Sequence, residues 1–307
     1  MRPLRASAII ALMFWLLGGA RFAWPAAQLL EREPIEVFQG EIVELKLSGT
    51  GLTPVEAQLG KNKIRFYPAE DKNYTALVGI DLETKPGLVK VVVKGATKAG
   101  IIRIIQLPIR VKTKSFQQES FSVAPQFDDL GPDLLERIRQ EQQQLDRVFA
   151  TFTPEQMWER PFIAPVSSDI TSPFGYRRII NGTPRAPHTG VDLRAPLGTQ
   201  VLAANHGRIA LTGDFFFSGK SVVLDHGGGL YTMYFHLSEL TVDEGAEVSK
   251  GDVIGLSGMT GRVTGPHLHW GARINGARVD PFQLIEKLRE RDQPAGGADA
   301  KPRTKEE

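Results

Sequence analysis

The chain has 307 residues, of which 41% are hydrophobic and none is cysteine. This length suffices for two modest domains with separate cores, while the lack of cysteine excludes disulfides and thiolate metal ligands. The formal net charge is +2, but the first 27 residues hold three arginines and no acid, so the remainder carries −1 and gives no indication of nucleic-acid binding.

The first 27 residues have the pattern of an export signal. Arg2 and Arg5 precede an uncharged apolar run over residues 6–20, and small residues follow it. This run is short for a membrane span, which needs about 20 residues. We therefore predict a signal peptide at residues 1–27 and export to the periplasm or cell envelope, with an uncleaved N-terminal membrane anchor as the alternative.

Residues 30–113 have the pattern of a small all-β domain. Val43, Leu45 and Leu47 alternate with charged residues, which is the period of a strand with one buried face. Further β-rich runs follow, separated by turn signals that contain glycine and proline. This spacing predicts an Ig-like β-sandwich. Its role can be binding, positioning or regulation of the rest of the chain.

Residues 114–160 form a connector that contains one helix. Pro132 follows Gly131 and suits the first turn of a helix, and apolar residues then recur near helical spacing among many Gln, Glu and Arg residues. We expect this helix to pack one face on a neighbouring domain. A short dimerising coiled coil is the alternative.

Residues 161–285 form the second domain, and residues 286–307 form a disordered tail. The second domain is rich in glycine and short β patterns and contains all six histidines of the chain. The tail has equal numbers of basic and acidic residues and few apolar ones. The predicted fold is thus mainly β, with an N-terminal sandwich, a connector helix and a C-terminal antiparallel β domain.

Two short segments of the second domain carry the donors of a metal site. His188 and Asp192 are four residues apart, and His267 and His269 are two apart. In an extended strand both spacings place the two side chains on one face, and the residues near His188 are poor helix formers. Two such strands can bring three imidazoles and one carboxylate together, which is the ligand chemistry of a catalytic zinc site.

The second domain resembles the lysostaphin/LytM-type zinc endopeptidases over about residues 161–284. The motifs that carry the resemblance are TSPFGYRR at 171–178, HTGVD at 188–192, YFHL at 234–237, TGR at 260–262 and GPHLHW at 265–270. The resemblance implies a compact antiparallel β fold with a metal in a groove. It also implies that His188, Asp192 and His269 bind Zn²⁺ and that His236 and His267 are the catalytic histidines.

The predicted function is that of an exported zinc metalloendopeptidase that cuts peptidoglycan peptides, in the stem cross-link or in an interpeptide bridge. Zinc would activate water, and the two catalytic histidines would act in proton transfer and in stabilising the tetrahedral oxyanion. The alternative is a non-catalytic regulator of other cell-wall hydrolases. Because such a relative would lack some of the five site residues and all five are present, the sequence favours the enzyme. A regulatory protein partner remains a hypothesis without a sequence signal.

Four further features of the second domain have a less specific meaning. We expect His206 and His226 to be structural or turn residues. The run of three aromatics at residues 215–217 is expected either to line the groove or to pack on the connector helix or the N-terminal domain. Phe235 stands where the family commonly has a small residue, so it is expected to narrow the groove.

Overall fold

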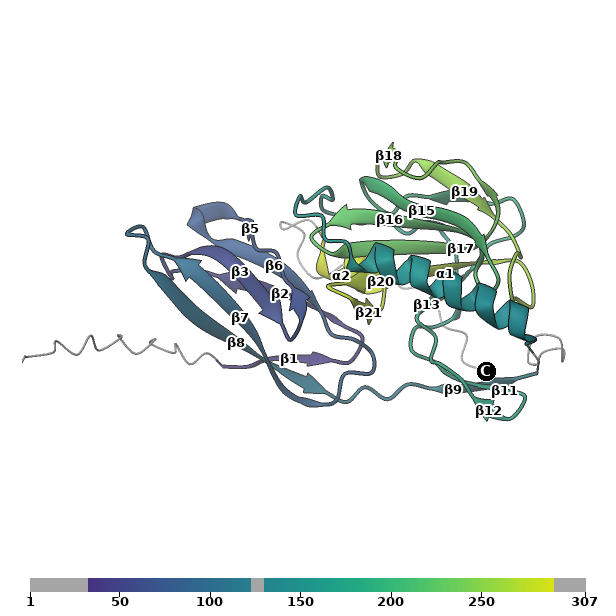
Figure 1. The fold of residues 1–307 in the computed structure, drawn as a ribbon, viewed down its shortest axis with the longest axis horizontal. Helices are drawn as coiled ribbons and strands as arrows, with labels where there is room; N and C mark the ends of the chain where they lie inside the picture. Colours follow the sequence, from purple (N-terminus) through teal and green to yellow (C-terminus); the bar gives the residue numbers. More distant parts are fainter. Residues whose placement is uncertain (1–32, 123–129, 290–307) are drawn as a thin grey trace, which may run out of the picture.

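The computed structural model describes residues 33–122 and 130–289, and it is mainly β with two α-helices. Figure 1 shows a smaller β body formed by the strands up to residue 112, a larger β body formed by the strands from residue 170 onward, and one long helix lying across the larger body. The predicted signal or anchor at residues 1–27 and most of the predicted tail lie outside the described residues. Within the described part, no helix is long and apolar enough to cross a membrane.

The N-terminal body is a sandwich of two sheets, as predicted. The first sheet has the order β1 (Ile35–Phe38), β8 (Ile102–Lys112), β7 (Gly87–Ala96), β3 (Thr53–Leu59) and β4 (Asn62–Lys63). The second has the order β2 (Ile42–Leu47), β6 (Tyr74–Gly79) and β5 (Tyr67–Pro68), and the short 3₁₀ helix η1 (Glu70–Lys72) lies between β5 and β6. Alternate residues of β8, among them Leu107 and Ile109, are buried between the sheets, since successive side chains of a strand face opposite sides.

The predicted connector helix is α1 (Pro132–Ala150), and Pro132 occupies its first turn as expected. Leu145, Val148 and Phe149 pack on a core cluster of the larger body, and the ring of Phe149 meets Tyr231 edge-on with centroids 5.5 Å apart. The apolar face of α1 is thus used within its own chain. This contact agrees with a helix that packs on a neighbouring domain.

The C-terminal body is a ten-stranded sheet in which every pairing is antiparallel, as predicted. The main path is β10 (Ile170–Ser172), β13 (Gly190–Arg194), β20 (His267–Ile274), β17 (Leu230–Leu240), β16 (Gly219–Gly227), β15 (Gly207–Phe215) and β18 (Glu247–Val248). Off this path lie β14 (Gln200–Leu202), β19 (Val253–Ser257) and β21 (Ala277–Val279). Helix α2 (Phe282–Lys287) follows, so ordered structure runs past residue 286, where the tail was predicted to begin.

A third sheet joins the connector to the C-terminal body. It has the order β12 (Thr183–Pro184), β11 (Arg177–Ile180) and β9 (Gln118–Phe121), and β9 runs parallel to β11. The sequence assigned the residues of β9 to a connector and gave no sign of this pairing. A strand from the N-terminal half therefore lies beside the motif that opens the second domain.

The two bodies also pack directly on each other. Ile42 and Leu82 of the sandwich are buried in the core of the C-terminal body. Asp81, just after β6, accepts hydrogen bonds from Nε and Nη2 of Arg278 in β21, at 2.8 and 2.7 Å. Burial tends to raise the pKa of Asp81, but the hydrogen bonds from Arg278 outweigh it and hold the pKa below its ordinary value.

Replacing Asp81 with asparagine is expected to lower the free energy of unfolding by about 2 kcal/mol at pH 7, because charge-assisted hydrogen bonds to Arg278 are lost. The folded-state pKa of Asp81 is depressed, so its contribution is fully present above the unfolded pKa of about 3.9 and is lost as the pH falls through the folded pKa. Urea unfolding of both proteins from pH 7 down to pH 3 checks this. A stability difference that does not shrink below about pH 4 would contradict the assignment to the ionised carboxylate.

Candidate active site

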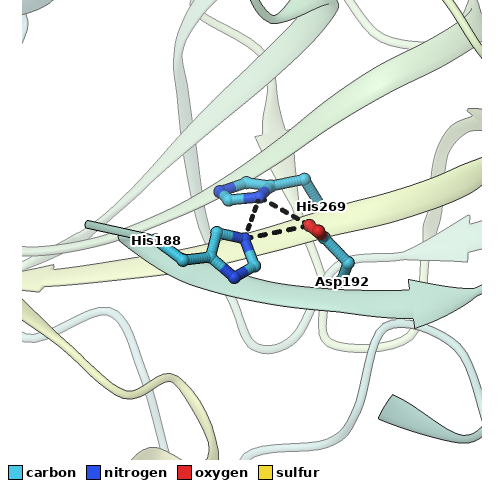
Figure 2. Close-up of side chains that lie close together, drawn as sticks. All are labelled: His188, Asp192 and His269. Carbon is cyan, nitrogen blue, oxygen red and sulfur yellow. Dashed lines mark hydrogen bonds and ion pairs between the residues drawn. The ribbon is translucent and has the colours of Figure 1, made fainter. Parts of the chain in front are cut away.

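Three of the predicted site residues converge beside the paired strands β13 and β20 of the ten-stranded sheet. Asp192 of β13 lies directly opposite His269 of β20 in the antiparallel register. Nε2 of His188 lies 3.0 Å from Oδ1 of Asp192 and 3.0 Å from Nδ1 of His269, and the last two atoms are 2.9 Å apart. Figure 2 shows the three side chains pointing at a common centre. Two imidazole nitrogens and one carboxylate oxygen thus meet within the reach of one metal ion.

The prediction that His188 and Asp192 share a strand is wrong for His188, which precedes β13 by two residues. His188 is held instead by the segment of residues 173–176. Its backbone N–H donates to the carbonyl of Tyr176, and its own carbonyl accepts from the N–H of Gly175. The side chain reaches the same centre because this loop fixes it, with only 1% of His188 exposed.

The hydrogen bonds of His188 make it a suitable metal ligand. Its Nδ1 lies 2.9 Å from the carbonyl oxygen of Pro173, which can only accept, so Nδ1 carries the proton. In the neutral ring Nε2 then has a free lone pair, and this nitrogen faces Asp192 and His269. A backbone carbonyl that fixes the tautomer of a ligand histidine is a common feature of metal sites.

The protonation states of the other two residues also fit a metal. Burial lowers the pKa of His269 to about 4, so the ring is neutral near pH 7. Burial tends to raise the pKa of Asp192, but the contacts with His188 and His269 outweigh it and hold the pKa well below its ordinary value. A neutral imidazole and an ionised carboxylate are the forms that bind metals. Since two histidines and one carboxylate form a three-ligand set that leaves a fourth position open, the residues fit zinc.

Two neighbours of His269, Gly190 and Phe235, have side chains that suit the position of its ring. A Cβ on Gly190 would lie 2.6 Å from Nε2 of His269 and 2.5 Å from the carbonyl of Trp270, so only glycine leaves room for the ring. The ring of Phe235 stacks on His269 with an angle of 4° and centroids 5.3 Å apart. Phe235 therefore supports this histidine, and the prediction that it narrows the groove is wrong because its ring packs toward the core beneath α1.

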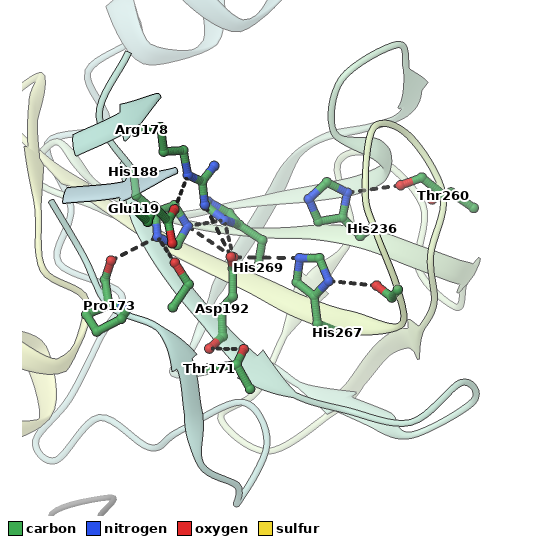
Figure 3. Close-up of polar contacts among 12 residues, drawn as sticks. Glu119, Thr171, Pro173, Arg178, His188, Asp192, His236, Thr260, His267 and His269 are labelled. Carbon is green, nitrogen blue, oxygen red and sulfur yellow. Dashed lines mark hydrogen bonds and ion pairs between the residues drawn. The ribbon is translucent and has the colours of Figure 1, made fainter. Parts of the chain in front are cut away.

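His236 and His267 lie beside the three-residue cluster. Their ring centroids are 4.9 Å apart, and that of His236 is 6.1 Å from His269. Nδ1 of His236 donates to the carbonyl of Thr260 at 2.9 Å, and Nδ1 of His267 donates to that of Gly265 at 2.8 Å. Figure 3 shows the remaining nitrogen of each ring turned away from these carbonyls. Nε2 of His267 is 3.7 Å from Oδ1 of Asp192.

Burial, reinforced by His269 and His267, lowers the pKa of His236 to about 3. His236 also has a backbone φ of 66°, in the left-handed region that few residues other than glycine and asparagine adopt readily. The backbone N–H of His236 donates to the carbonyl of Ser218 at 2.9 Å, which helps to hold this conformation. The fold thus keeps a neutral histidine in an unusual backbone conformation next to the cluster.

A groove with a volume of about 760 Å³ exposes this site. Its lining includes Asp192 and the histidines at 236, 267 and 269, while the loop of residues 262–266 and the end of β9 supply other parts of its wall. Three guanidinium groups also line it, from Arg178, Arg194 and Arg262. The site is therefore accessible to a ligand of peptide size, and the carboxylates of Glu119 and Asp192 line the groove together with the three arginines.

The aromatic run at residues 215–217 packs on the connector helix, which is one of the two predicted alternatives, and none of its three residues is among those that line the groove. Phe215 is buried in the cluster that receives α1, and the N–H of Phe216 donates to Glu141 of that helix at 2.9 Å. The guanidinium carbon of Arg262 lies 4.4 Å from the ring centroid of Phe217. Phe217 thus supports one of the arginines of the groove.

The other two histidines have structural contacts. His226 is fully buried at the end of β16, where Nδ1 donates to the carbonyl of His206 at 2.7 Å and Nε2 lies 2.8 Å from Oγ1 of Thr232. His206 accepts a hydrogen bond from the backbone N–H of Lys250 at 3.3 Å. Neither residue lines the groove, in agreement with the prediction.

Sequence reasoning gave no role to Glu119 and Arg178, although both line the groove. Nε of Arg178 donates to Oε1 of Glu119 at 2.8 Å, and Nη2 of Arg178 lies 3.3 Å from Oδ2 of Asp192. Figure 3 shows this guanidinium between the two carboxylates. Arg178 belongs to the TSPFGYRR motif, so the sequence could have identified it as a site residue. Glu119 belongs to no motif and reaches the site only through the β9–β11 pairing.

Comparisons with known proteins agree with this geometry. Residues 186–281 match the model of peptidase family M23. A Pseudomonas aeruginosa protein, whose crystal structure was solved as a candidate peptidase M23, is 32% identical, with a TM-score of 0.65 over 83% of this chain and 96% of that chain.

Two curated relatives match over a shorter region. The peptidoglycan DD-endopeptidase ShyA of Vibrio cholerae serotype O1 is 39% identical over 140 residues, which are 45% of this chain and 30% of the relative. The DD-carboxypeptidase/endopeptidase Mpg of Neisseria meningitidis serogroup B is 48% identical over 120 residues, which are 39% of this chain and 27% of the relative. The match thus spans less than a third of the length of each curated relative.

Proposed function

Because this chain belongs to peptidase family M23, we propose that it is an exported zinc endopeptidase that hydrolyses peptide cross-links in peptidoglycan. The observation that carries the proposal is the convergence of His188, Asp192 and His269, with His236 and His267 beside them in an open groove. The name of the Vibrio cholerae relative, a peptidoglycan DD-endopeptidase, supports the substrate class.

In this proposal His188, Asp192 and His269 hold the zinc ion. Bound zinc supplies Lewis-acid chemistry, which polarises a peptide carbonyl and lowers the pKa of water. Nδ1 of His236 and Nδ1 of His267 each face a backbone carbonyl, which only accepts hydrogen bonds, so in the neutral form of either ring Nε2 carries the lone pair that accepts a proton. A proton taken from the attacking water is then available to the leaving amine nitrogen when the peptide bond breaks.

Digestion of purified cross-linked peptidoglycan by the zinc-loaded full chain tests the proposal. We expect mass spectrometry of the released muropeptides to show cross-linked dimers converted to monomers. A chelator should stop the conversion, because two neutral imidazoles and one carboxylate hold the metal only by reversible coordination, and added zinc should restore it.

The products of this digestion separate the proposal from its rivals. Loss of one terminal residue from uncross-linked stems, with dimers unchanged, would indicate a carboxypeptidase. Intact dimers in the presence of a full equivalent of bound zinc would contradict the endopeptidase and favour the non-catalytic regulator. Conversion that persists in chelator, after zinc has been shown to be absent, would contradict a metal-dependent reaction.

We also propose that residues 1–27 direct export, since two arginines followed by an apolar run are the pattern that secretion machinery reads. The N-terminal sequence of the protein recovered from the cell envelope tests this. A chain that begins near residue 28 fits a cleaved signal, an intact N-terminus in the membrane fraction fits an anchor, and recovery of the protein in the cytoplasm alone would contradict export.

A further inference from the structure

The carboxylate of Asp192 has two oxygens with different partners. Oδ1 faces His188 and His269, where the metal is proposed to bind, while Oδ2 lies 3.3 Å from Nη2 of Arg178. Arg178 is itself fixed, since its Nε donates to Glu119 at 2.8 Å. The side chains of Glu119 and Arg178 are each only about a quarter exposed, at 26% and 27%. A chain of charge-assisted hydrogen bonds thus runs from β9 to the carboxylate of the metal cluster.

The strand that supplies Glu119 is firmly attached to the C-terminal body. Glu119 and Arg178 are direct partners in the parallel β9–β11 register. The hydroxyl of Tyr176 donates to Gln117 at 2.6 Å. Phe116 fills the space over Gly175, where a Cβ would lie 2.1 Å from the Phe116 ring. These contacts place the carboxylate of Glu119 at one position relative to Arg178.

A planar guanidinium held at one edge keeps its other N–H groups in a fixed direction. The contact with Glu119 therefore aims Nη2 at Oδ2 of Asp192 and keeps Oδ1 toward the two histidines. Hydrogen bonds to a ligating carboxylate tune metal affinity and activity by about 10–100-fold in characterised sites. Both Glu119 and Arg178 lie outside residues 186–281, the region that matches the family model.

We propose that Arg178, aligned by Glu119 of β9, is a positioning residue that fixes the orientation of the Asp192 carboxylate. This inference rests on the proposed function, because it assigns Asp192 to the metal. The connector between the two bodies is then part of the active site. The segment upstream of the family match contributes to metal binding through a single ion pair.

The first test measures zinc affinity of the full chain by competition with a chromophoric chelator. We expect Arg178→Gln to weaken zinc binding by about 10–100-fold. Loss of a positive charge near the metal would by itself strengthen zinc binding, so weaker binding reports the loss of orientation. Arg178→Lys keeps the charge without the planar fork, and we expect it to restore only part of the affinity.

The matched control is Arg194→Gln. Arg194 also lines the groove, but its Nε lies 3.8 Å from Oδ2 of Asp169, and its side chain is 66% exposed. We expect this variant to change zinc affinity by less than about twofold, since the removal of one exposed charge has a small effect. Melting curves of the metal-free proteins show whether each variant is folded. If Arg178→Gln does not fold, the zinc affinity of the conservative Arg178→Lys variant is compared with that of the native chain instead.

A double-mutant cycle tests the role of Glu119. Glu119→Gln is expected to weaken zinc binding in the native background and to have little further effect in the Arg178→Gln background, because Glu119 acts through Arg178. A pure charge effect of Glu119 on zinc would persist in both backgrounds and would overturn its positioning role.

Three results would overturn the proposal as a whole: zinc affinity unchanged in Arg178→Gln, zinc affinity increased in it, or higher kcat/KM in Glu119→Gln. The last would mean that the ion pair restrains the enzyme. The affinity measurement needs no hydrolysis, so it separates this inference from the proposed function. A chain that binds zinc through this ion pair but does not cut peptidoglycan would support the positioning role and contradict the endopeptidase.

Discussion

Replacing His188 with alanine is expected to remove both the bound zinc and the hydrolytic activity. His188 supplies one of the three donors that the described residues bring together, and its Nε2 lies 3.0 Å from each of the other two ligand atoms. Two donors would leave the metal with too few protein ligands for a stable site. Because the metal contributes several kcal/mol of transition-state stabilisation, we expect kcat/KM to fall by about 10³-fold or more.

Metal analysis after gel filtration checks this expectation, with muropeptide release measured on the same sample. His206→Ala is the matched control, since His206 belongs to the same body but is held by Lys250 and does not line the groove. We expect that control to keep one zinc per chain and its activity. A His188→Ala protein that retains a full equivalent of zinc and hydrolyses dimers would remove His188 from the ligand set.

The two-residue period of a strand correctly predicted the part of the site that lies on a single strand, β20. His267 and His269 were predicted to share a face of a strand, and in β20 both rings approach Oδ1 of Asp192, with nitrogen–oxygen distances of 3.7 and 2.9 Å. The same reasoning failed for His188, because a loop can direct a side chain to the same centre without strand periodicity. The resemblance to the zinc endopeptidases supplied the pairing of distant segments that periodicity alone cannot give.

What the sequence could not predict depends on contacts between distant segments. Glu119 lies 59 residues from Arg178, and the parallel pairing of their strands leaves no mark in either local pattern. The sandwich was predictable from alternating residues, but its attachment through Asp81 and Arg278, 197 residues apart, was not. Long-range ion pairs involve residue types that are also common on exposed surfaces, so composition and spacing do not distinguish them.

Replacing His236 with asparagine is expected to abolish most of the catalysis while leaving zinc in place. His236 is not within the three-donor cluster, and its Nδ1 is bonded to the carbonyl of Thr260. Loss of a general acid–base group lowers kcat by about 10²–10⁴-fold. Asparagine is the sharper substitution because φ at this position is 66°, which asparagine tolerates better than alanine. The loss then reports on the imidazole and not on backbone strain.

The measurement is kcat, KM and zinc content for His236→Asn, His267→Ala and the double variant. If the two rings serve one proton path, each single variant loses most of the rate and the double variant loses little more, because groups that act as a unit are not additive. Additive losses would assign them to separate steps. Loss of zinc from His236→Asn would instead make His236 part of the metal site, and unchanged kcat would exclude it from the proton path. If His236→Asn keeps its zinc but loses turnover, while His188→Ala loses both, then His188 is the residue that holds the metal and His236 is the residue that moves the proton.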